Sequence, residues 1–354
     1  MSKPNQQTIA ELANVSRATV SRCFTNHPGI NPETRAAVFR VAAEVGYRHL
    51  EPRTGFRVAN APKSTIGVII CTHMSDYVRS DFQSPGVQIH SGISEYAQLH
   101  KLGIDLRYAN PAEDSIEGES YRAIDPIRRR GWGGCLLIYP FPANVIEALR
   151  MSFPVVSLVE SYASNPVDCV DVDHFTGISA IVDHLLALGH QRIGFYTQQY
   201  EVEASWSLRR HSAFMEKMVR LGRRVSDTDM INVFPNLPIS QGKGFDEVAD
   251  RVAKGVTAWV CAADHQAFEL IAALEQRGFR VPTDVSVTGF DGVQSFEKKR
   301  TLSTVMIPYR EIGYTGAKRL HDLMRRRFVS PQHILVGNRI REGDTTAPLP
   351  SVWP

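Results

Sequence analysis

Two arginines five residues apart, Arg17 and Arg22, are the side chains of the N-terminal segment with the clearest potential chemistry. The run from Arg17 to Phe24 predicts a short helix in which Val20 and Phe24 point to one side. Both arginines and Ala18 are then available on the outside. A guanidinium donates two hydrogen bonds to the edge of a guanine, and an alanine methyl can contact the methyl group of thymine. On the outside of a helix, these residue types are therefore compatible with contacts to base edges.

Three short helices are needed to position these side chains, and the sequence predicts each of them. The first covers residues 8–13, and Asn14 follows where the chain must turn sharply, which asparagine tolerates in a left-handed conformation. Ser16 can cap the second helix. The third begins at Asn31, followed by a proline and an acid, and ends at Gly46. This pattern predicts a helix-turn-helix whose second helix can lie in the major groove of DNA.

The charge of the chain is concentrated in this region. Residues 1–60 carry eight Lys and Arg against four Glu, a net charge of +4, which leaves −1 for residues 61–354 of a chain whose total is +3. A small basic head on a nearly neutral body is typical of a phosphate-binding module attached to another domain.

The run from Thr8 to Arg48 resembles the DNA-binding head of the LacI/GalR family almost without a gap. The matching motifs are ANVSxxTVSR, then NPETR, then the Gly-Tyr pair. The resemblance implies that Arg17, Ala18 and Arg22 read bases. It also implies a set of residues that contact the phosphate backbone and fix the register on DNA: Ser16, Thr19, Ser21, Asn31, Arg35 and Tyr47.

The connecting segment, residues 49–63, departs from the family pattern. The family has a Pro-Asn pair and an Ala-Arg-x-Leu hinge helix, whose leucine inserts into the minor groove. Here Pro52 and Gly55 disfavour a helix by about 3 and about 1 kcal/mol relative to alanine, and Phe56 stands where the leucine is expected. Phenylalanine is a known wedge between base steps. We expect Phe56 to insert on a hinge that orders only on DNA; a flexible linker without a wedge is the alternative.

The body of the chain alternates between short buried runs and helix-length segments. Alternation of this kind predicts parallel sheets covered by helices on both faces, with ligands beyond the carboxyl ends of the strands. The predicted strands are 64–71, 134–139, 154–159, 191–196, 258–262 and 285–289, and the clearest helices are 92–102, 178–188 and 266–277.

The body also resembles the LacI/GalR effector domain, which is similar to periplasmic sugar-binding proteins. The matching runs include VDVDHFTGISAIVDHLLALGHQRIGF, VPTDVSVTGFDG and REGDTTAP, in family order. The resemblance implies a small all-α helix-turn-helix head plus an α/β, two-lobed periplasmic-binding-protein-like domain with parallel sheets. The expected division is a DNA-binding domain at 1–48, a hinge at 49–63 and an effector domain at 64–354, with one lobe at about 64–160 and 293–327 and the other at about 161–292 and 328–354.

Arg210 and Asp291 are the residues that the resemblance assigns most directly to the effector. Arg210 occupies the family's R-x-x-G-F position, although Ala213 replaces the glycine, and Asp291 lies in the Gly-Phe-Asp run. A buried arginine and aspartate facing a cleft can bind vicinal hydroxyl groups, so we expect a carbohydrate. A structural ion pair is the alternative. Asp264 belongs to the family's Asn-Asp pair, but Ala263 replaces the asparagine and removes an amide that often binds a sugar hydroxyl.

Four further residues are expected near the effector. Trp206 and Phe234 provide aromatic faces that can stack on a sugar ring or a flat base. Glu160 ends a predicted strand and would contribute from the other lobe. His73 follows the first strand of the body. These assignments also rest on the family resemblance.

Enzymatic chemistry has little support in the sequence. No GxxxxGK[ST] loop, HExxH or triad signature is present, and the run Gly131-Trp-Gly-Gly opens a strand rather than following one, as a dinucleotide loop would. The five cysteines are scattered without metal-binding spacing. We expect no enzymatic activity, no metal and no cofactor. The nearest enzymatic alternative is a helix-turn-helix fused to a sugar-kinase-like body.

The sequence favours the cytoplasm. Residues 1–12 lack the apolar core of a secretory signal, and no run approaches the ~20 apolar residues of a membrane span. We expect a cytoplasmic protein that associates with the nucleoid through DNA binding and has no membrane partner. A pure solute-binding protein, the alternative without DNA, conflicts with the missing export signal and the basic head.

The resemblance implies three partners: double-stranded DNA, a small-molecule effector and a second copy of the chain. A homodimer would bind a pseudo-palindromic operator, each head reading one half-site. The predicted function is a transcriptional regulator of the repressor type, controlled by an effector, first of all a sugar or sugar derivative. A regulator that binds DNA constitutively and has lost its effector is the alternative favoured by Ala263.

Overall fold

The computed structural model describes residues 5–24, 29–45, 65–72, 84–110, 112–113, 117–118, 121, 131–162, 166–198, 205–231, 244–293, 300–325, 327 and 330–349. Four residues with predicted roles lie outside these ranges: Tyr47, Phe56, His73 and Phe234. Within the described ranges, no helix is both long and apolar enough to cross a membrane.

The N-terminal head consists of the three predicted helices, α1 (Gln6–Leu12), α2 (Arg17–Phe24) and α3 (Pro32–Glu44). Asn14 has a φ of 50°, which is the left-handed turn that separates α1 from α2. The Ser16 hydroxyl accepts a hydrogen bond from the Thr19 amide at 3.0 Å and so caps α2. The three helices bury a common apolar core that includes Ile9 and Val20.

The chain divides into two compact units. The first contains Met1–Arg79, Ser84–Asp171 and Tyr309–Leu335. The second contains Ser80–Gln83, Val172–Pro308 and Val336–Pro354.

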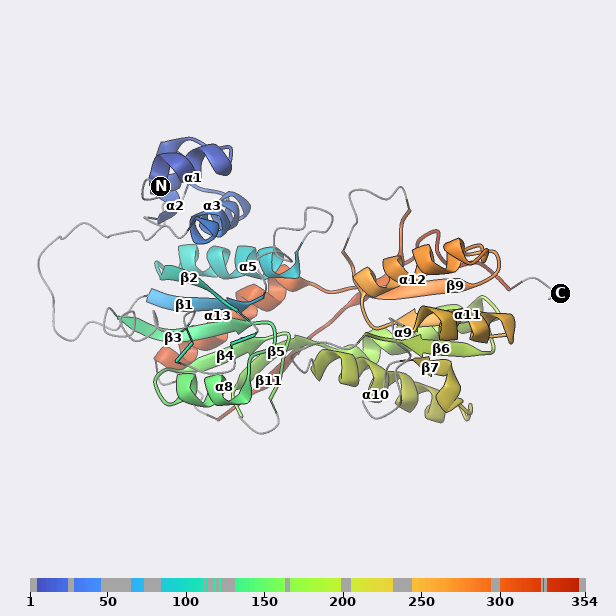
Figure 1. The fold of residues 1–354 in the computed structure, drawn as a ribbon. Coiled ribbons are helices and arrows are strands. Elements are labelled where there is room, and N and C mark those ends of the chain that lie inside the picture. The colour runs from blue at the N-terminus through green and yellow to red at the C-terminus, as the bar shows by residue number, and fades with distance from the viewer. Residues whose placement is uncertain are drawn as a thin grey trace, which may run out of the picture. The chain divides into compact units, whose positions relative to one another are not determined.

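The first unit contains the head and a six-stranded sheet with the order β11-β5-β4-β3-β1-β2. Helices α5 (Pro85–Leu99) and α8 (Ala143–Arg150) lie on opposite faces of this sheet, and α13 (Tyr309–Met324) packs against α5 (Figure 1). The strands are β1 (Thr65–Cys71), β2 (Gly103–Ala109), β3 (Trp132–Ile138), β4 (Val155–Leu158), β5 (Asp168–Val172) and β11 (His333–Val336).

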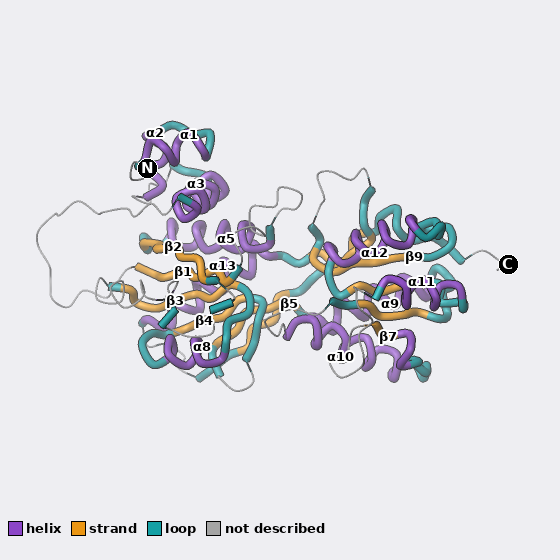
Figure 2. Tube along the Cα trace, in the orientation of Figure 1, coloured by secondary structure: helices purple, strands orange, loops and turns teal. Residues whose placement is uncertain are grey.

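The second unit contains another six-stranded sheet, with the order β12-β10-β9-β8-β6-β7. Only β12 is antiparallel to its neighbour among the pairs that the structure describes. Figure 2 shows the strands of this sheet flanked by helices, as a buried parallel sheet requires. The strands are β6 (Ile193–Tyr196), β7 (Met230–Ile231), β8 (Ala258–Cys261), β9 (Ser286–Asp291), β10 (Ser303–Met306) and β12 (Arg339–Arg341), and the helices are α9 (His174–Ala187), α10 (Ser205–Arg220), α11 (Phe245–Ala253) and α12 (Asp264–Gln276), with a 3₁₀ turn η1 at Asp227–Asp229.

The chain passes between the units later than the sequence predicts. Crossings were expected near residues 160, 292 and 328, but β5 pairs with β4 in the first sheet and β10 pairs with β9 in the second. The backbone pairing of these strands therefore moves the crossings to 171/172, 308/309 and 335/336.

Two glycines allow α5 and α13 to pack with their backbones in contact. A Cβ at Gly92 would clash with the backbone carbonyl of Arg310, and one at Gly313 would clash with that of Ile89. Both obstacles are main-chain atoms of packed helices, so neither can move without shifting a helix.

We expect Gly92→Ala to lower the free energy of unfolding by about 1–3 kcal/mol, the usual cost of inserting a methyl group into a packed core. Gly337→Ala is the matched control, because a Cβ at Gly337 meets no atom within 4 Å. Thermal unfolding of the two variants measures the difference. Equal melting temperatures would contradict the close approach of α5 and α13.

Candidate functional site

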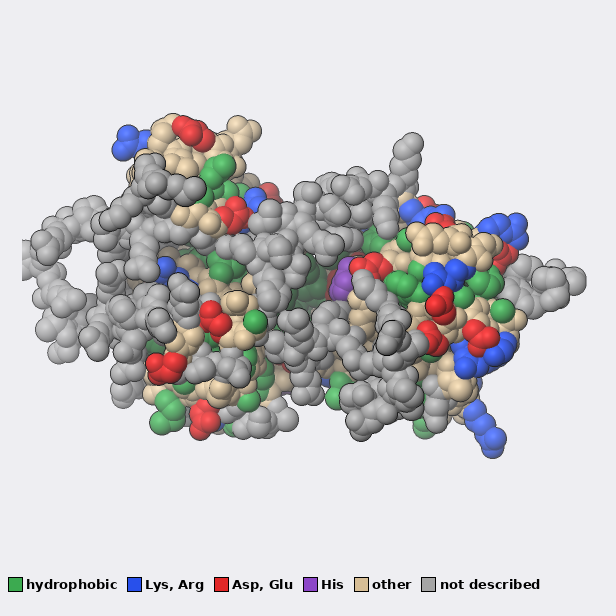
Figure 3. Space-filling model, in the orientation of Figure 1, with side chains coloured by type: hydrophobic (Ala, Val, Ile, Leu, Met, Phe, Trp, Pro, Cys, Tyr) green, Lys and Arg blue, Asp and Glu red, His purple; other side chains and the backbone are tan. Residues whose placement is uncertain are grey.

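Helix α2 presents its predicted base-reading residues to solvent. Arg17, Ala18 and Arg22 are all exposed, whereas Val20 and Cys23 on the opposite side are buried in the head. Figure 3 shows basic side chains projecting from the surface of the helical head. A capped helix with two exposed arginines on one face fits the geometry of a recognition helix in a major groove.

The residues predicted to contact phosphate divide into two groups. Ser16 and Asn31 are exposed, and their side chains cap α2 and α3; the Asn31 amide oxygen accepts from the Glu33 amide at 2.7 Å. Thr19 and Ser21 are partly buried on α2.

Arg35 differs from the prediction. Its side chain is fully buried, and its Nη1 donates to the carbonyl oxygen of Cys23 at 2.8 Å. In this structure Arg35 holds the carboxyl end of α2 to α3, and its guanidinium is not presented to a phosphate. The family motif identified an arginine at this position, but the motif alone does not say on which side of α3 it lies.

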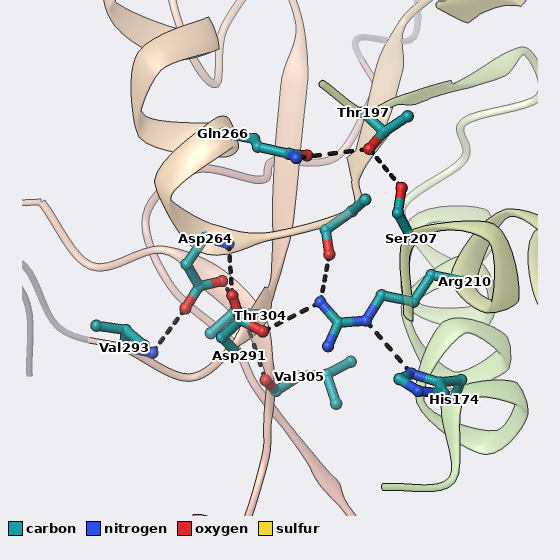
Figure 4. Close-up of polar contacts among 11 residues, drawn as sticks. His174, Thr197, Ser207, Arg210, Asp264, Gln266, Asp291, Val293, Thr304 and Val305 are labelled. Atoms are coloured by element: carbon teal, nitrogen blue, oxygen red, sulfur yellow. Dashed lines mark hydrogen bonds and ion pairs between the residues drawn. The ribbon is translucent and has the colours of Figure 1, made fainter. Parts of the chain in front are cut away.

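The second candidate site is built around Arg210 on α10, in the second unit (Figure 4). Its Nη1 donates to Asp291 Oδ1 at 3.0 Å and to the carbonyl oxygen of Ala262 at 2.5 Å. Its Nε donates to His174 Nδ1 at 3.3 Å, which places the imidazole proton on Nε2. The side chains of Arg210 and Asp291 are only 5% and 13% exposed, so the ion pair is largely desolvated. The sequence predicted Arg210 and Asp291 as effector-binding residues, with an ion pair between them as the alternative, and it did not predict His174.

Two aromatic rings flank the guanidinium of Arg210. Its Cζ lies 4.0 Å from the centroid of the Phe290 ring and 4.7 Å from that of Trp206. Contacts of this kind stabilise a cation when water is excluded. The structure therefore brings Trp206 into contact with Arg210.

Asp264 is adjacent to this pair but is held by the protein itself. Its backbone amide donates to Asp291 Oδ2 at 3.3 Å, while its carboxylate accepts from the Val293 amide at 2.7 Å and from the Thr304 hydroxyl at 2.5 Å. The side chain is fully buried. Desolvation, and after it the charge of Asp291, raises the pKa of Asp264 to about 8. Asp264 thus positions Asp291 and the segment after β9, rather than facing a ligand in this structure.

Asp291 itself has an unusual backbone. Its φ is 150°, a region that residues other than glycine rarely adopt, and Gly292 follows with a φ of 75°. Backbone outliers of this kind cluster at ligand sites, where the surrounding structure fixes them. Here the hydrogen bonds of Asp264 on both sides of the turn provide that constraint.

Figure 4 also shows a short chain of hydrogen-bonded polar side chains that the sequence did not predict. The hydroxyl groups of Thr197 and Ser207 lie 2.7 Å apart, and Gln266 Nε2 donates to Thr197 Oγ1 at 3.5 Å. Thr197 directly follows β6, where a parallel sheet places ligand-binding groups. The position of Thr197 at the end of a predicted strand could have identified it from the sequence.

Glu160 lies in the first unit, two residues after the end of β4, and is only 2% exposed. The thiol of Cys169 donates to its backbone carbonyl at 3.1 Å. Burial, and after it the charge of Glu160, raises the pKa of Tyr162 well above its ordinary value. The structure thus places the Glu160 carboxylate near a phenol within its own unit.

Comparisons with known proteins find matches to both the head and the body of the chain. Residues 7–49 match the model of bacterial regulatory proteins of the lacI family, and residues 182–346 match that of the periplasmic binding protein-like domain. The chain belongs to the LacI family of regulators. It is a DNA-binding protein with a periplasmic-binding-protein-like body.

Relatives extend over nearly the whole chain. The repressor CytR of Escherichia coli K12 is 28% identical over 342 residues, which cover 94% of this chain and 92% of the relative. The catabolite control protein A of Priestia megaterium is 23% identical over 342 residues, covering 96% and 98%.

Solved structures of this family share the fold. A complex of the regulator CelR with cellobiose has a TM-score of 0.65 at 20% identity and covers 97% of this chain and 99% of its own. The lac repressor dimer bound to operator and the anti-inducer ONPF has a TM-score of 0.63 at 22% identity, covering 98% and 100%.

The raised pKa of Asp264 predicts a pH-dependent stability. Protonation of Asp264 stabilises the fold; this contribution is fully present below the ordinary pKa of 3.8 and is lost as the pH rises through about 8. We expect the difference in melting temperature between the native chain and Asp264→Asn to change between pH 5 and 8.5, with the native chain losing more. Asp246→Asn is the control, because the Asp246 side chain is 85% exposed. A difference that stays constant with pH would contradict the burial of an ionisable Asp264.

Proposed function

We propose that this LacI-family protein is an effector-controlled transcriptional repressor that reads a specific operator through α2. The observation that carries the proposal is the exposed face of Arg17, Ala18 and Arg22 on a capped recognition helix, within a segment that matches the family's DNA-binding model. Each arginine would bind a guanine edge with two hydrogen bonds. Ser16, Thr19, Ser21, Asn31 and Tyr47 would contact phosphate, and Phe56 would insert into the minor groove.

The active form we propose is a homodimer on a pseudo-palindromic operator. A two-fold protein requires a two-fold site, and one head would read each half. The lac repressor, which shares this fold, was solved as a dimer bound to operator. The proposal includes no catalytic activity, no cofactor and no membrane partner, and it locates the protein in the cytoplasm, where the operator lies.

We also propose that the effector binds at Arg210 and Asp291 and is a carbohydrate or a derivative of one. Arg210 Nη2 has no hydrogen-bond partner among the described residues, and Asp291 supplies acceptor oxygens beside it. Vicinal hydroxyl groups match this donor and acceptor pair. Regulators with this fold have been solved with cellobiose, glucose and ribose bound.

Two residues of this site bear on which effectors it can bind. Ala263, where the family has an asparagine, is buried and offers no side-chain amide. Trp206 adds an aromatic face that can stack on a sugar ring or on a flat base. Phe234 would add a further aromatic contact, and Glu160 and His73 stay predictions from the sequence. A regulator that has lost its effector is the remaining alternative, and a ligand screen separates the two.

Arg22→Ala should weaken binding to the cognate operator by about 1–3 kcal/mol, roughly 5- to 150-fold, and relax the preference at one base pair of each half-site. The operator is first enriched from random double-stranded DNA, and affinities are then measured by fluorescence anisotropy at fixed salt. Arg40→Ala removes the same charge from α3 and serves as the matched control, with a smaller and sequence-independent effect. Equal losses on operator and random DNA would contradict base reading by Arg22.

Asp291→Asn should reduce the thermal stabilisation produced by a sugar effector at least tenfold, or abolish it. The substitution removes the charged acceptor and keeps the shape of the side chain. A panel of mono- and disaccharides and nucleosides provides the ligands. Asp229→Asn is the control, because Asp229 is a buried aspartate of the same unit that forms an ion pair with the partly exposed Arg192 at 2.8 Å. Ligand stabilisation that persists in Asp291→Asn and disappears in Asp229→Asn would contradict this placement of the site.

A further inference from the structure

A cysteine, an aspartate and a histidine converge on the first sheet, beside Glu160, whose backbone carbonyl accepts a hydrogen bond from the cysteine thiol. The Sγ of Cys169, a carboxylate oxygen of Asp171 and a ring nitrogen of His333 all lie within 4.8 Å of one another. Cys169 and Asp171 are buried, and His333 is exposed. The sequence predicted no metal site because it showed no local ligand spacing, whereas here the histidine comes from a distant part of the chain.

The pairing of two strands explains why these side chains meet. β5 carries Cys169 and Asp171, which lie two residues apart and therefore on the same face. β11 is the neighbour of β5, and the Cys169 amide donates to the Gln332 carbonyl at 2.9 Å, which sets Cys169 beside His333. Asp168 faces the other side of the sheet, where Arg319 of α13 binds it at 2.5 Å. The backbone thus fixes all three side chains on one face.

We propose that Cys169, Asp171 and His333 bind a zinc ion. Thiolate, imidazole and carboxylate are the zinc ligands of proteins, at about 2.0–2.3 Å from the metal. A tetrahedral arrangement at those lengths separates ligand atoms by about 3.2–3.8 Å, and the three ligand atoms already lie within 4.8 Å of one another. Because His333 is exposed, water supplies the fourth ligand. On binding, the Cys169 thiol gives up to solvent the proton that it now donates to the Glu160 carbonyl.

The location gives such an ion a structural consequence. β5 and β11 are the strands that leave the first unit at Asp171 and at Leu335. A metal bound to both strands links them immediately before the chain continues into the second unit. Binding to the folded state alone also raises the melting temperature with metal concentration.

The test uses the full chain, stripped with a chelator and titrated with ZnCl₂ by calorimetry against a competing chelator. We expect one zinc ion bound at this cluster per chain, and at least tenfold weaker binding in His333→Gln. His333 is exposed, so this variant retains the fold that replacement of the buried Cys169 could disturb. His100→Gln, another exposed histidine of the first unit, is the matched control and should bind like the native chain.

Cobalt(II) provides a spectroscopic readout of the same site. A thiolate ligand gives the bound cobalt a charge-transfer absorption, which we expect in the native chain and in His100→Gln but not in Cys169→Ser. Zinc affinity that is equal in the native chain and His333→Gln, or the absence of a stoichiometric zinc site, would overturn the proposal. Neither result would affect operator binding, so the zinc proposal fails or stands independently of the proposed function.

Discussion

The second unit depends on how it accommodates one buried positive charge. Removing a guanidinium from water costs several kcal/mol unless other groups replace the lost hydration. Arg210 receives that replacement from Asp291, from the Ala262 carbonyl and from His174, and from two aromatic rings. These groups lie on or beside β9, β8, α9 and α10, so satisfying this charge fixes the relative positions of those elements.

The same constraint would make this site respond to the effector that we propose. Asp291 stands in a rare backbone conformation, and Asp264 anchors it through its amide and holds the segment beyond it through Val293. A ligand that takes hydrogen bonds from Arg210 must compensate for those it displaces, and it therefore alters the groups that position β9. A ligand can shift the protein only by the difference between its affinities for two states. Arg210 and Asp291 can bind either each other or a ligand. This competition is a physical basis for a difference in ligand affinity between two states.

The head and the fold class could be predicted from the sequence because their signals are local. Asn14, Ser16 and Asn31 each control a turn or a helix start through their own side chain, and all three behave as expected. The parallel sheets followed from buried runs that alternate with helices. Arg210 and Asp291 were found because the family motif marks them.

The remaining features depend on contacts between distant segments. No local pattern indicates that Arg35 turns inward to the Cys23 carbonyl, or that Thr304 binds Asp264. The assignment of β5 to the first sheet and β10 to the second follows from pairing between strands, which periodicity does not encode. The sequence did not predict the cluster of Cys169, Asp171 and His333, because this cluster also depends on the pairing of distant strands.

We propose that a ligand at Arg210 and Asp291 controls the reading of DNA by α2. This proposal is tested most directly by measuring operator affinity with and without saturating effector, and effector affinity with and without operator. Thermodynamic linkage requires the two factors to be equal, and couplings of this kind are typically about 5- to 150-fold. We expect equal factors within that range in the native chain, and a factor of one in Asp291→Asn. An effector that binds at this site and leaves operator affinity unchanged would contradict it.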